Sequence, residues 1–118
     1  MGITTIDARI FHPASPAKTI ELKFTVDSGA GYSVVPTGVL AELGIDSHTV
    51  KRFYLANGDG IERRMGIAGF EYLGEITAAP VIFGEEGDAA LMGATTLEGF
   101  GFVLDPFRRE LRPMSMRM

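Results

Sequence analysis

The strongest constraint on the fold is a strict alternation of apolar and polar residues over 20–26. The apolar positions are Ile20, Leu22, Phe24 and Val26, and the polar positions are Glu21, Lys23 and Thr25. A period of two is typical of a strand with one buried face. The alternation runs directly into the polar, glycine-bearing turn 27–31. We therefore expect a buried strand that holds the side chains of this turn at a defined place.

Shorter patterns of the same kind predict strands along the rest of the chain. Turn residues separate them about every eight to twelve residues, which is typical of barrels and sandwiches. We expect further strands within 6–10, 33–35 and 53–56, from 61 onward, and within 70–73, 76–83, 100–104 and 109–112. We expect short helices over 37–43 and 94–98. The chain is therefore predicted to be one mainly β domain over residues 1–118, a barrel or a sandwich.

Composition excludes several classes of site. Fifteen acidic and eleven basic residues give a formal charge of −4, which argues against a nucleic-acid partner. The absence of cysteine rules out disulfides and thiolate chemistry. His12 and His48 are the only histidines, and we interpret both as loop residues, too few for a zinc centre. Asp59 lacks the spaced oxygen ligands of a calcium loop. We expect neither a metal nor a cofactor.

The location of the protein is predicted from what the sequence lacks. Residues 1–11 have neither the basic start nor the continuous apolar run of a signal peptide. No stretch approaches the ~20 apolar residues that span a bilayer. The sequence therefore predicts a cytoplasmic protein with no membrane contact.

The turn after the alternating strand has several possible meanings. Asp27-Ser28-Gly29 by itself suits an ordinary β-turn, because all three residue types favour turns. Residues 29–34 begin like a dinucleotide-binding loop but lack its third glycine, and Ser33 fails the pattern of a nucleophile elbow. We interpret Ser33 as structural, and Tyr32, Tyr54 and Tyr72 as sheet or core residues. The turn gains meaning from elements farther along the chain.

Four elements together resemble the retropepsin-like aspartic proteases of the bacterial or archaeal kind. They are the strand and turn 24–30, the polar hairpin 57–60, the apolar-apolar-Gly segment Leu91-Met92-Gly93, and the segment 103–105 with a short terminal strand. Their order is that of the family, and they cover most of the chain. The resemblance implies a closed acid-protease barrel with one or two short helices.

The resemblance also implies a mechanism and a homodimer. In aspartic proteases two carboxylates share one proton and activate a water between them. Here Asp27 stands in such a turn, whereas Asp7, Asp88 and Asp105 are not followed by Ser-Gly or Thr-Gly. A symmetric dimer with Asp27 at the two-fold axis would supply both carboxylates. The implied reaction is hydrolysis of peptide bonds in a polypeptide substrate, without a cofactor.

The neighbouring residues receive roles from the same resemblance. Ser28 would brace the two turns across the dimer axis, Gly29 would leave room for backbone amides, and Ala30 would line the substrate floor. The hairpin formed by Asn57, Gly58, Asp59 and Gly60 would be the flap that closes over the peptide. Leu91, Met92 and Gly93 would lie across from the active-site loop. The methionine-rich tail, Met114, Met116 and Met118, is either a frayed end or part of the dimer interface.

Two other interpretations stay open. One is a catalytically inactive retropepsin-like module that binds peptides or only dimerises. The other is an unrelated small β-barrel in which the turn at Asp27 is an ordinary one. Two departures from viral members concern the dimer contacts: Ser28 replaces the commoner Thr, and Ala94 and Thr95 stand where charged residues pair between viral subunits.

Overall fold

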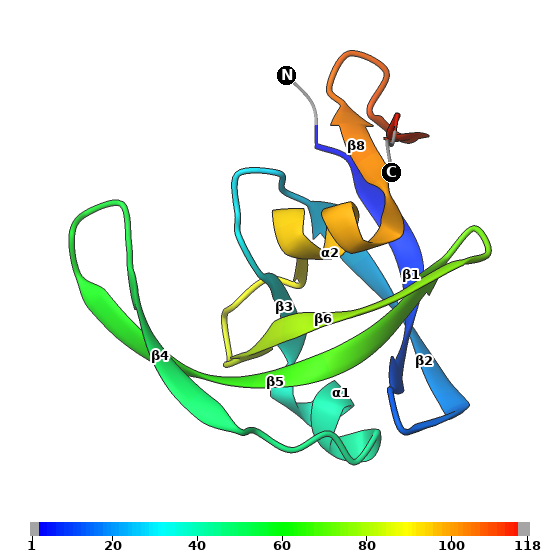
Figure 1. The fold of residues 1–118 in the computed structure, drawn as a ribbon. Helices are drawn as coiled ribbons and strands as arrows, with labels where there is room; N and C mark the ends of the chain where they lie inside the picture. Colours follow the sequence, from blue (N-terminus) through cyan, green and yellow to red (C-terminus); the bar gives the residue numbers. More distant parts are fainter. Residues whose placement is uncertain (1–2, 116–118) are drawn as a thin grey trace.

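The structure is a computed structural model that describes residues 3–115, so Met116 and Met118 lie outside the described residues. Within this range the chain forms short strands and two short helices (Figure 1). The elements are β1 (Thr5–His12), β2 (Ser15–Val26), β3 (Ser33–Pro36), α1 (Thr37–Glu42), β4 (Thr49–Tyr54), β5 (Gly60–Tyr72), β6 (Glu75–Gly84), β7 (Leu91–Met92), α2 (Ala94–Phe100), β8 (Phe102–Asp105) and β9 (Glu110–Pro113).

The large sheet closes on itself. Its strand order is β1-β2-β7-β3-β6-β5-β4, and β1 pairs a second time with β5, so six strands form a ring with β4 attached outside it. β8 and β9 form a separate two-stranded sheet. The expected mainly β class with a closed barrel is confirmed, and the sandwich is excluded. Closure removes the exposed edges that an open sheet would present.

The seam between β1 and β5 depends on a glycine. Phe11 and Gly69 face each other across the seam, and a Cβ on Gly69 would lie 2.1 Å from Phe11 Cε2. The buried Phe11 ring thus occupies the space beside the glycine. An aromatic side chain that covers a cross-strand glycine is a known way to fix register in curved sheets.

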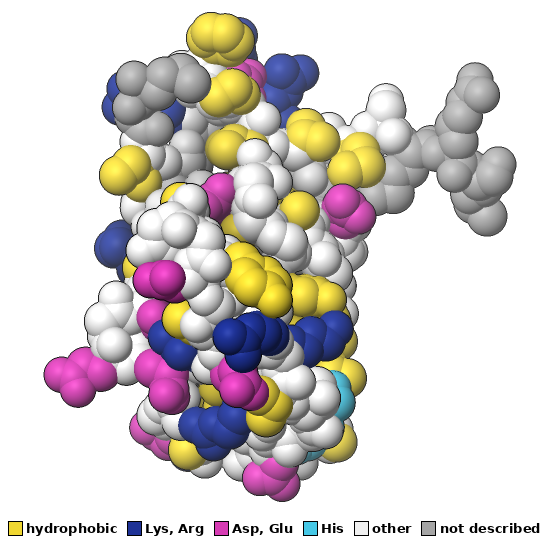
Figure 2. Space-filling model, turned by 90° about the vertical axis from the view of Figure 1, so that its left-hand side faces the viewer, with side chains coloured by type: hydrophobic (Ala, Val, Ile, Leu, Met, Phe, Trp, Pro, Cys, Tyr) yellow, Lys and Arg dark blue, Asp and Glu magenta, His cyan; other side chains and the backbone are white. Residues whose placement is uncertain are grey.

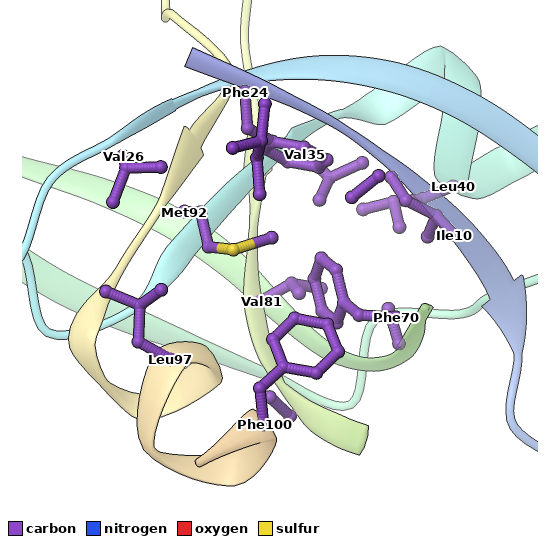
Figure 3. Close-up of a cluster of buried hydrophobic side chains, with 14 of the residues drawn as sticks. Ile10, Phe24, Val26, Val35, Leu40, Phe70, Val81, Met92, Leu97 and Phe100 are labelled. Carbon is purple, nitrogen blue, oxygen red and sulfur yellow. The ribbon is translucent and has the colours of Figure 1, made fainter. Parts of the chain in front are cut away.

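The core fills the interior of this ring (Figure 3). Its fully buried apolar side chains include Ile10, Phe24, Val35, Leu40, Phe70, Val81 and Met92. The rings of Phe24 and Phe70 lie 5.9 Å apart between centroids and tilted to each other. Leu97 and Phe100 from α2 cover one end of the cluster. The alternating segment 20–26 therefore forms the buried strand that its period predicts, with Phe24 and Val26 inside.

The order of strands in the sheet departs from their order in the sequence at β7. β2 and β3 are consecutive in sequence, yet β7 lies between them, parallel to β2 and antiparallel to β3. Leu91 and Met92 pair with Thr25 and Val26, the last residues before Asp27. The apolar-apolar-Gly segment is therefore held against the end of the buried strand.

Several predicted boundaries are wrong, and the reason is mainly continuity of pairing. The strand expected over 53–56 begins at Thr49 and ends at Tyr54. The strands expected from 61 and over 70–73 are one strand, β5, because it pairs in turn with β4, β6 and β1. The strand expected over 100–104 begins at Phe102, because α2 continues through Phe100. α1 ends one residue before the predicted Leu43.

One buried polar cluster joins β3 to α2. The hydroxyls of Ser33 and Thr96 lie 2.6 Å apart, and the Gly93 amide donates to Ser33 Oγ at 3.0 Å. Ser33 and Thr96 are fully buried. In the described residues no buried side-chain nitrogen or oxygen lacks a hydrogen-bond partner. Ser33 is thus structural, as its sequence context suggested.

Replacing Ser33 by Ala should lower the free energy of unfolding by about 1–3 kcal/mol, because the buried Thr96 hydroxyl and Gly93 amide lose a partner. Urea denaturation of both proteins measures the difference. Ser47→Ala is the matched control, because its hydroxyl bonds to Thr49 O in an exposed loop, and it should change stability by less than about 0.5 kcal/mol. An equal effect of the two substitutions would contradict the structural role of Ser33.

Candidate active site

Asp27 is the first residue after β2, and its backbone is tied to β7. Its amide donates to Met92 O at 3.0 Å, and the preceding Val26 amide donates to Thr4 O at 2.8 Å. The Asp27 side chain is exposed, although Val26 beside it is buried. A strand end held by two backbone bonds thus presents a carboxylate to solvent at a fixed place.

The turn orients this carboxylate through its own backbone. The Gly29 amide donates to Asp27 Oδ1 at 3.0 Å, and the Ala30 amide donates to Asp27 O at 3.1 Å. A Cβ on Gly29 would lie 3.3 Å from Asp27 Oδ1, closer than most side-chain contacts. Glycine therefore lets the amide approach the carboxylate without crowding it.

The start of α2 supports the same loop. The amides of Ala94 and Thr95 donate to Ala30 O at 2.7 Å and Gly31 O at 3.0 Å. The first amides of a helix have no partner within the helix, so they are available for such bonds. A Cβ on Gly93 would lie 2.6 Å from Tyr32 O, a backbone atom that cannot easily move. The structure thus brings Leu91, Met92 and Gly93 together with the loop 27–32.

Asp27 opens onto a largely apolar groove between the barrel and the β4–β5 hairpin. Its lining comes mainly from the loop after β2, from the hairpin, and from the segment before β7. The lining residues are Asp27, Ala30, Gly31, Tyr32, Val34, Phe53, Tyr54, Leu55, Ala56, Ile61, Arg63, Ile82, Gly87, Asp88, Ala89 and Leu91. Three of these residues are charged. The groove therefore suits a ligand with apolar side chains that approaches a single uncompensated carboxylate.

The hairpin between β4 and β5 projects away from the barrel (Figure 1). Its turn is closed by the Leu55 amide, which donates to Asp59 O at 2.8 Å, and Gly58 has φ 91°. The Asp59 amide also donates to the Asn57 side chain at 2.9 Å. Asn57, Gly58, Asp59 and Gly60 form the tip, whereas the groove is lined by the residues on either side of it.

The prediction that the tyrosines are sheet or core residues is wrong for Tyr32, which is half-buried in a bend and lines the groove. Tyr54 is a sheet residue, the last of β4, but it is 72% exposed and also lines the groove. Tyr72 lies among the core residues as predicted, edge-on to Phe102. Periodicity alone could not find the two groove residues, because Tyr32 lies in a bend before β3 and the groove brings it together with the distant β4–β5 hairpin.

An ion pair joins the hairpin to the loop before β7. Arg63 Nε and Nη2 donate to the two oxygens of Asp88 at 2.8 and 3.2 Å, and Asp88 also accepts the Glu85 amide at 2.8 Å. The hydrogen bond from Arg63 lowers the pKa of Asp88, with a further contribution from the Glu85 amide. The two residues are 25 positions apart, so no local sequence signal could predict the pair.

Ser28 lies away from the groove lining. It is exposed and borders a shallow hollow with Ala94, Leu97 and Glu98 of α2, and with part of β8 and Met114. This hollow is separate from the side of Asp27 that faces the hairpin. Ser28 is thus placed on a surface that a second protein could cover.

The described residues contain neither a cluster of metal ligands nor a helix that could span a membrane. Among residues 3–115 no three His, Asp or Glu side chains are grouped as metal ligands would be. In the same range no helix has the length and apolar character needed to cross a membrane.

Comparison with known proteins identifies the fold. No protein-family model matches the chain, and no curated protein sequence matches it. The crystal structure of a retropepsin-like aspartic protease from Rickettsia conorii is similar, with a TM-score of 0.52 and 23% sequence identity over 88% of this chain and 85% of that chain. At this identity the likeness establishes the fold alone: the chain has a retropepsin-like fold.

Proposed function

We propose that the protein is an aspartic endopeptidase, in which two copies of the chain bring two Asp27 carboxylates together. The observation that carries this proposal is the placement of Asp27, exposed at the end of a buried strand and facing an apolar groove. The retropepsin-like fold supports it. Polypeptide is the substrate class that an open, largely apolar groove beside a projecting hairpin fits best.

The contacts of three other aspartates support the proposed homodimer. Asp88 shares the groove with Asp27 but is bound to Arg63, and Asp105 accepts the amides of Phe107 and Arg108 in its own turn. Asp7 pairs with Lys23 on β2. These three side chains have partners of their own within residues 3–115, which supports a symmetry-related Asp27 as the second catalytic group.

The proposed reaction uses the paired carboxylates as acid and base. Two carboxylates in contact cannot both ionise, so they share one proton. The ionised one removes a proton from the water as its oxygen bonds to the carbonyl carbon, while the protonated one donates to the carbonyl oxygen. The C–N bond would then break as the amine nitrogen takes a proton from one carboxyl and the other carboxylate accepts a proton from the diol. The Gly29 amide, which already bonds to Asp27 Oδ1, would hold each carboxylate in plane during this exchange.

The other site residues act on the substrate or on the dimer. The peptide would lie extended in the groove and pair with backbone groups like an added strand, with Ala30 beneath it. The tip residues 57–60 would close over it and exclude water. Ser28, on the hollow beside α2, would contact the second copy.

Replacing Asp27 by Asn should reduce cleavage of a mixed peptide library by about 10²- to 10⁴-fold, because the pair loses its shared proton and its base. The assay covers pH 3.5 to 7 and follows products by mass spectrometry. Sedimentation and circular dichroism verify that the variant is still folded and dimeric. Asp46→Asn, an exposed aspartate outside the groove, is the control and should retain wild-type activity.

The other possible outcomes would contradict the proposed function in different ways. Cleavage that persists in the Asp27→Asn variant would place the chemistry elsewhere. A verified dimer that binds peptides but cleaves none at any pH would be the inactive module. A monomer at all concentrations would contradict both interpretations.

The acid end of this range also affects stability through Asp88. The pKa of Asp88 is lowered in the folded state by the hydrogen bond from Arg63. A carboxyl whose folded pKa is depressed stabilises the fold above its unfolded pKa of about 3.9, and that contribution is lost as the pH falls through the folded value. The ion pair should therefore stabilise the protein at pH 6 and cease to do so in strong acid.

Replacing Asp88 by Asn should lower the free energy of unfolding at pH 6, and the difference from wild type should shrink as the pH falls below about 4. Urea denaturation at pH 6 and pH 2.5 measures this difference. Glu86→Gln changes an exposed carboxylate in the same loop and should show a smaller difference at pH 6. A gap between wild type and Asp88→Asn that widens in acid would contradict the assigned ion pair.

A further inference from the structure

The base of the β4–β5 hairpin places two cations side by side on the groove. Lys51 and Arg63 are directly opposed across the two strands, and Phe53 and Ile61 are opposed two residues farther toward the tip. Directly opposed residues, and residues two apart on a strand, point to the same face. Phe53, Ile61 and Arg63 line the groove. Lys51 therefore lies on the groove face of β4, two residues before Phe53.

One of the two cations is already neutralised within the chain. Arg63 makes a two-point contact with Asp88, and both side chains are largely buried, with 19% and 27% of their surface exposed. Bidentate contacts of this kind are among the stronger ion pairs in proteins. Arg63 is therefore not available to a ligand unless Asp88 is displaced.

Lys51 has a different environment. Its Nζ donates to Tyr32 Oη at 3.3 Å and lies 5.3 Å from the centre of the Tyr32 ring. Tyr32 in turn packs edge-on against Phe53, with ring centres 6.3 Å apart. Of the ion pairs within residues 3–115, none includes Lys51. An ammonium has three donors, so a lysine held by one tyrosine can still bind a carboxylate.

The charge of the hairpin opposes that of the whole chain. Residues 49–64 contain four basic side chains and two acidic ones, whereas the protein carries a net charge of −4. On the face toward which the hairpin projects, Lys and Arg side chains lie across the middle, with apolar and acidic side chains among them (Figure 2). A cation that no ion pair compensates attracts an acidic group at short range.

We propose that Lys51, positioned by Tyr32, forms a subsite that binds the side-chain carboxylate of an aspartate or glutamate in the peptide. The groove then prefers peptides with apolar residues near Asp27 and an acidic residue at the position that reaches Lys51. This inference rests on the proposed peptide groove but not on catalysis. It names the substrate class that the hairpin recognises.

Binding to the Asp27→Asn variant tests the subsite without cleavage. The probes are acetylated and amidated apolar octapeptides with one Glu at each position in turn, paired with the same peptides containing Gln. Because their ends are blocked, side-chain carboxylates are the only acids they carry. Fluorescence anisotropy at pH 6.5 and 50 mM salt measures the dissociation constants.

We expect the Glu peptide to bind about three- to fivefold more tightly than the matching Gln peptide at one position, or at two positions separated by one residue. Two such positions face the same side of an extended peptide. Lys51→Met should remove this preference, and Lys51→Glu should transfer it to Lys-containing peptides. The preference should also disappear at pH 3, below the glutamate pKa of about 4.3, and weaken at 0.5 M salt.

Arg52→Met is the matched control, because Arg52 is the next residue along β4 and carries the same charge, but its guanidinium lies over the Tyr54 ring, 6.0 Å from the ring centre, and not over Tyr32. Its guanidinium lies against Gly60, where a Cβ would be 2.6 Å from Arg52 Nε. This variant should keep the preference for Glu. Loss of the Glu preference in both variants would show a diffuse charge effect, and retention in both would show that Lys51 does not bind the carboxylate. Either outcome would overturn the subsite.

The remaining outcomes separate this inference from the proposed function. If wild type cleaves peptides but Glu and Gln bind equally at every position, the subsite is wrong and the peptidase stands. If Glu is preferred through Lys51 but no peptide is cleaved, the subsite stands and catalysis is wrong. If neither peptide series binds, the groove does not take peptides and the subsite falls.

Discussion

The insertion of β7 between β2 and β3 is the contact on which the site depends. This strand is only two residues long, yet Met92 accepts the Asp27 amide, and the residues after it donate to Ala30 and Gly31. Such close approach of two backbones leaves no space for a side chain at position 93. The carboxylate is thus held by backbone groups of a segment distant in sequence, which gives it a fixed position without burying it.

The hairpin side of the groove is less tightly integrated than this centre. In the described residues its base is tied to the barrel by Arg63–Asp88 on one side and by Lys51–Tyr32 on the other, while its tip is exposed. The Phe53 ring also packs edge-on against Tyr32, and Arg64 Nη2 donates to Thr37 Oγ1 at 3.4 Å. A carboxylate held by backbone bonds therefore faces a hairpin whose base contacts the barrel mainly through side chains.

The sequence predicts the parts of this architecture that local pattern determines. The alternation over 20–26 predicts β2 and its buried face, and the glycine-bearing turn predicts a presented side chain. Long-range geometry is different: Gly66 and Gly69 look like breaks in β5, but they are places where a Cβ would meet Phe83 or Phe11. The groove roles of Tyr32, Arg63 and Asp88 likewise depend on pairings between distant segments, which no local pattern encodes.

The charges of the groove form a consistent set. Asp88 lines the same groove as Asp27 and would add a second negative charge to it if it were alone. Arg63 compensates this charge locally, and its pairing leaves Lys51 beside the groove as a cation that no ion pair within residues 3–115 includes. Under the two proposals above, this ion pair would separate two tasks, with the chemistry at Asp27 and charge recognition at Lys51. The Arg63–Asp88 contact at the base of the hairpin would then link substrate recognition to the proposed catalytic centre.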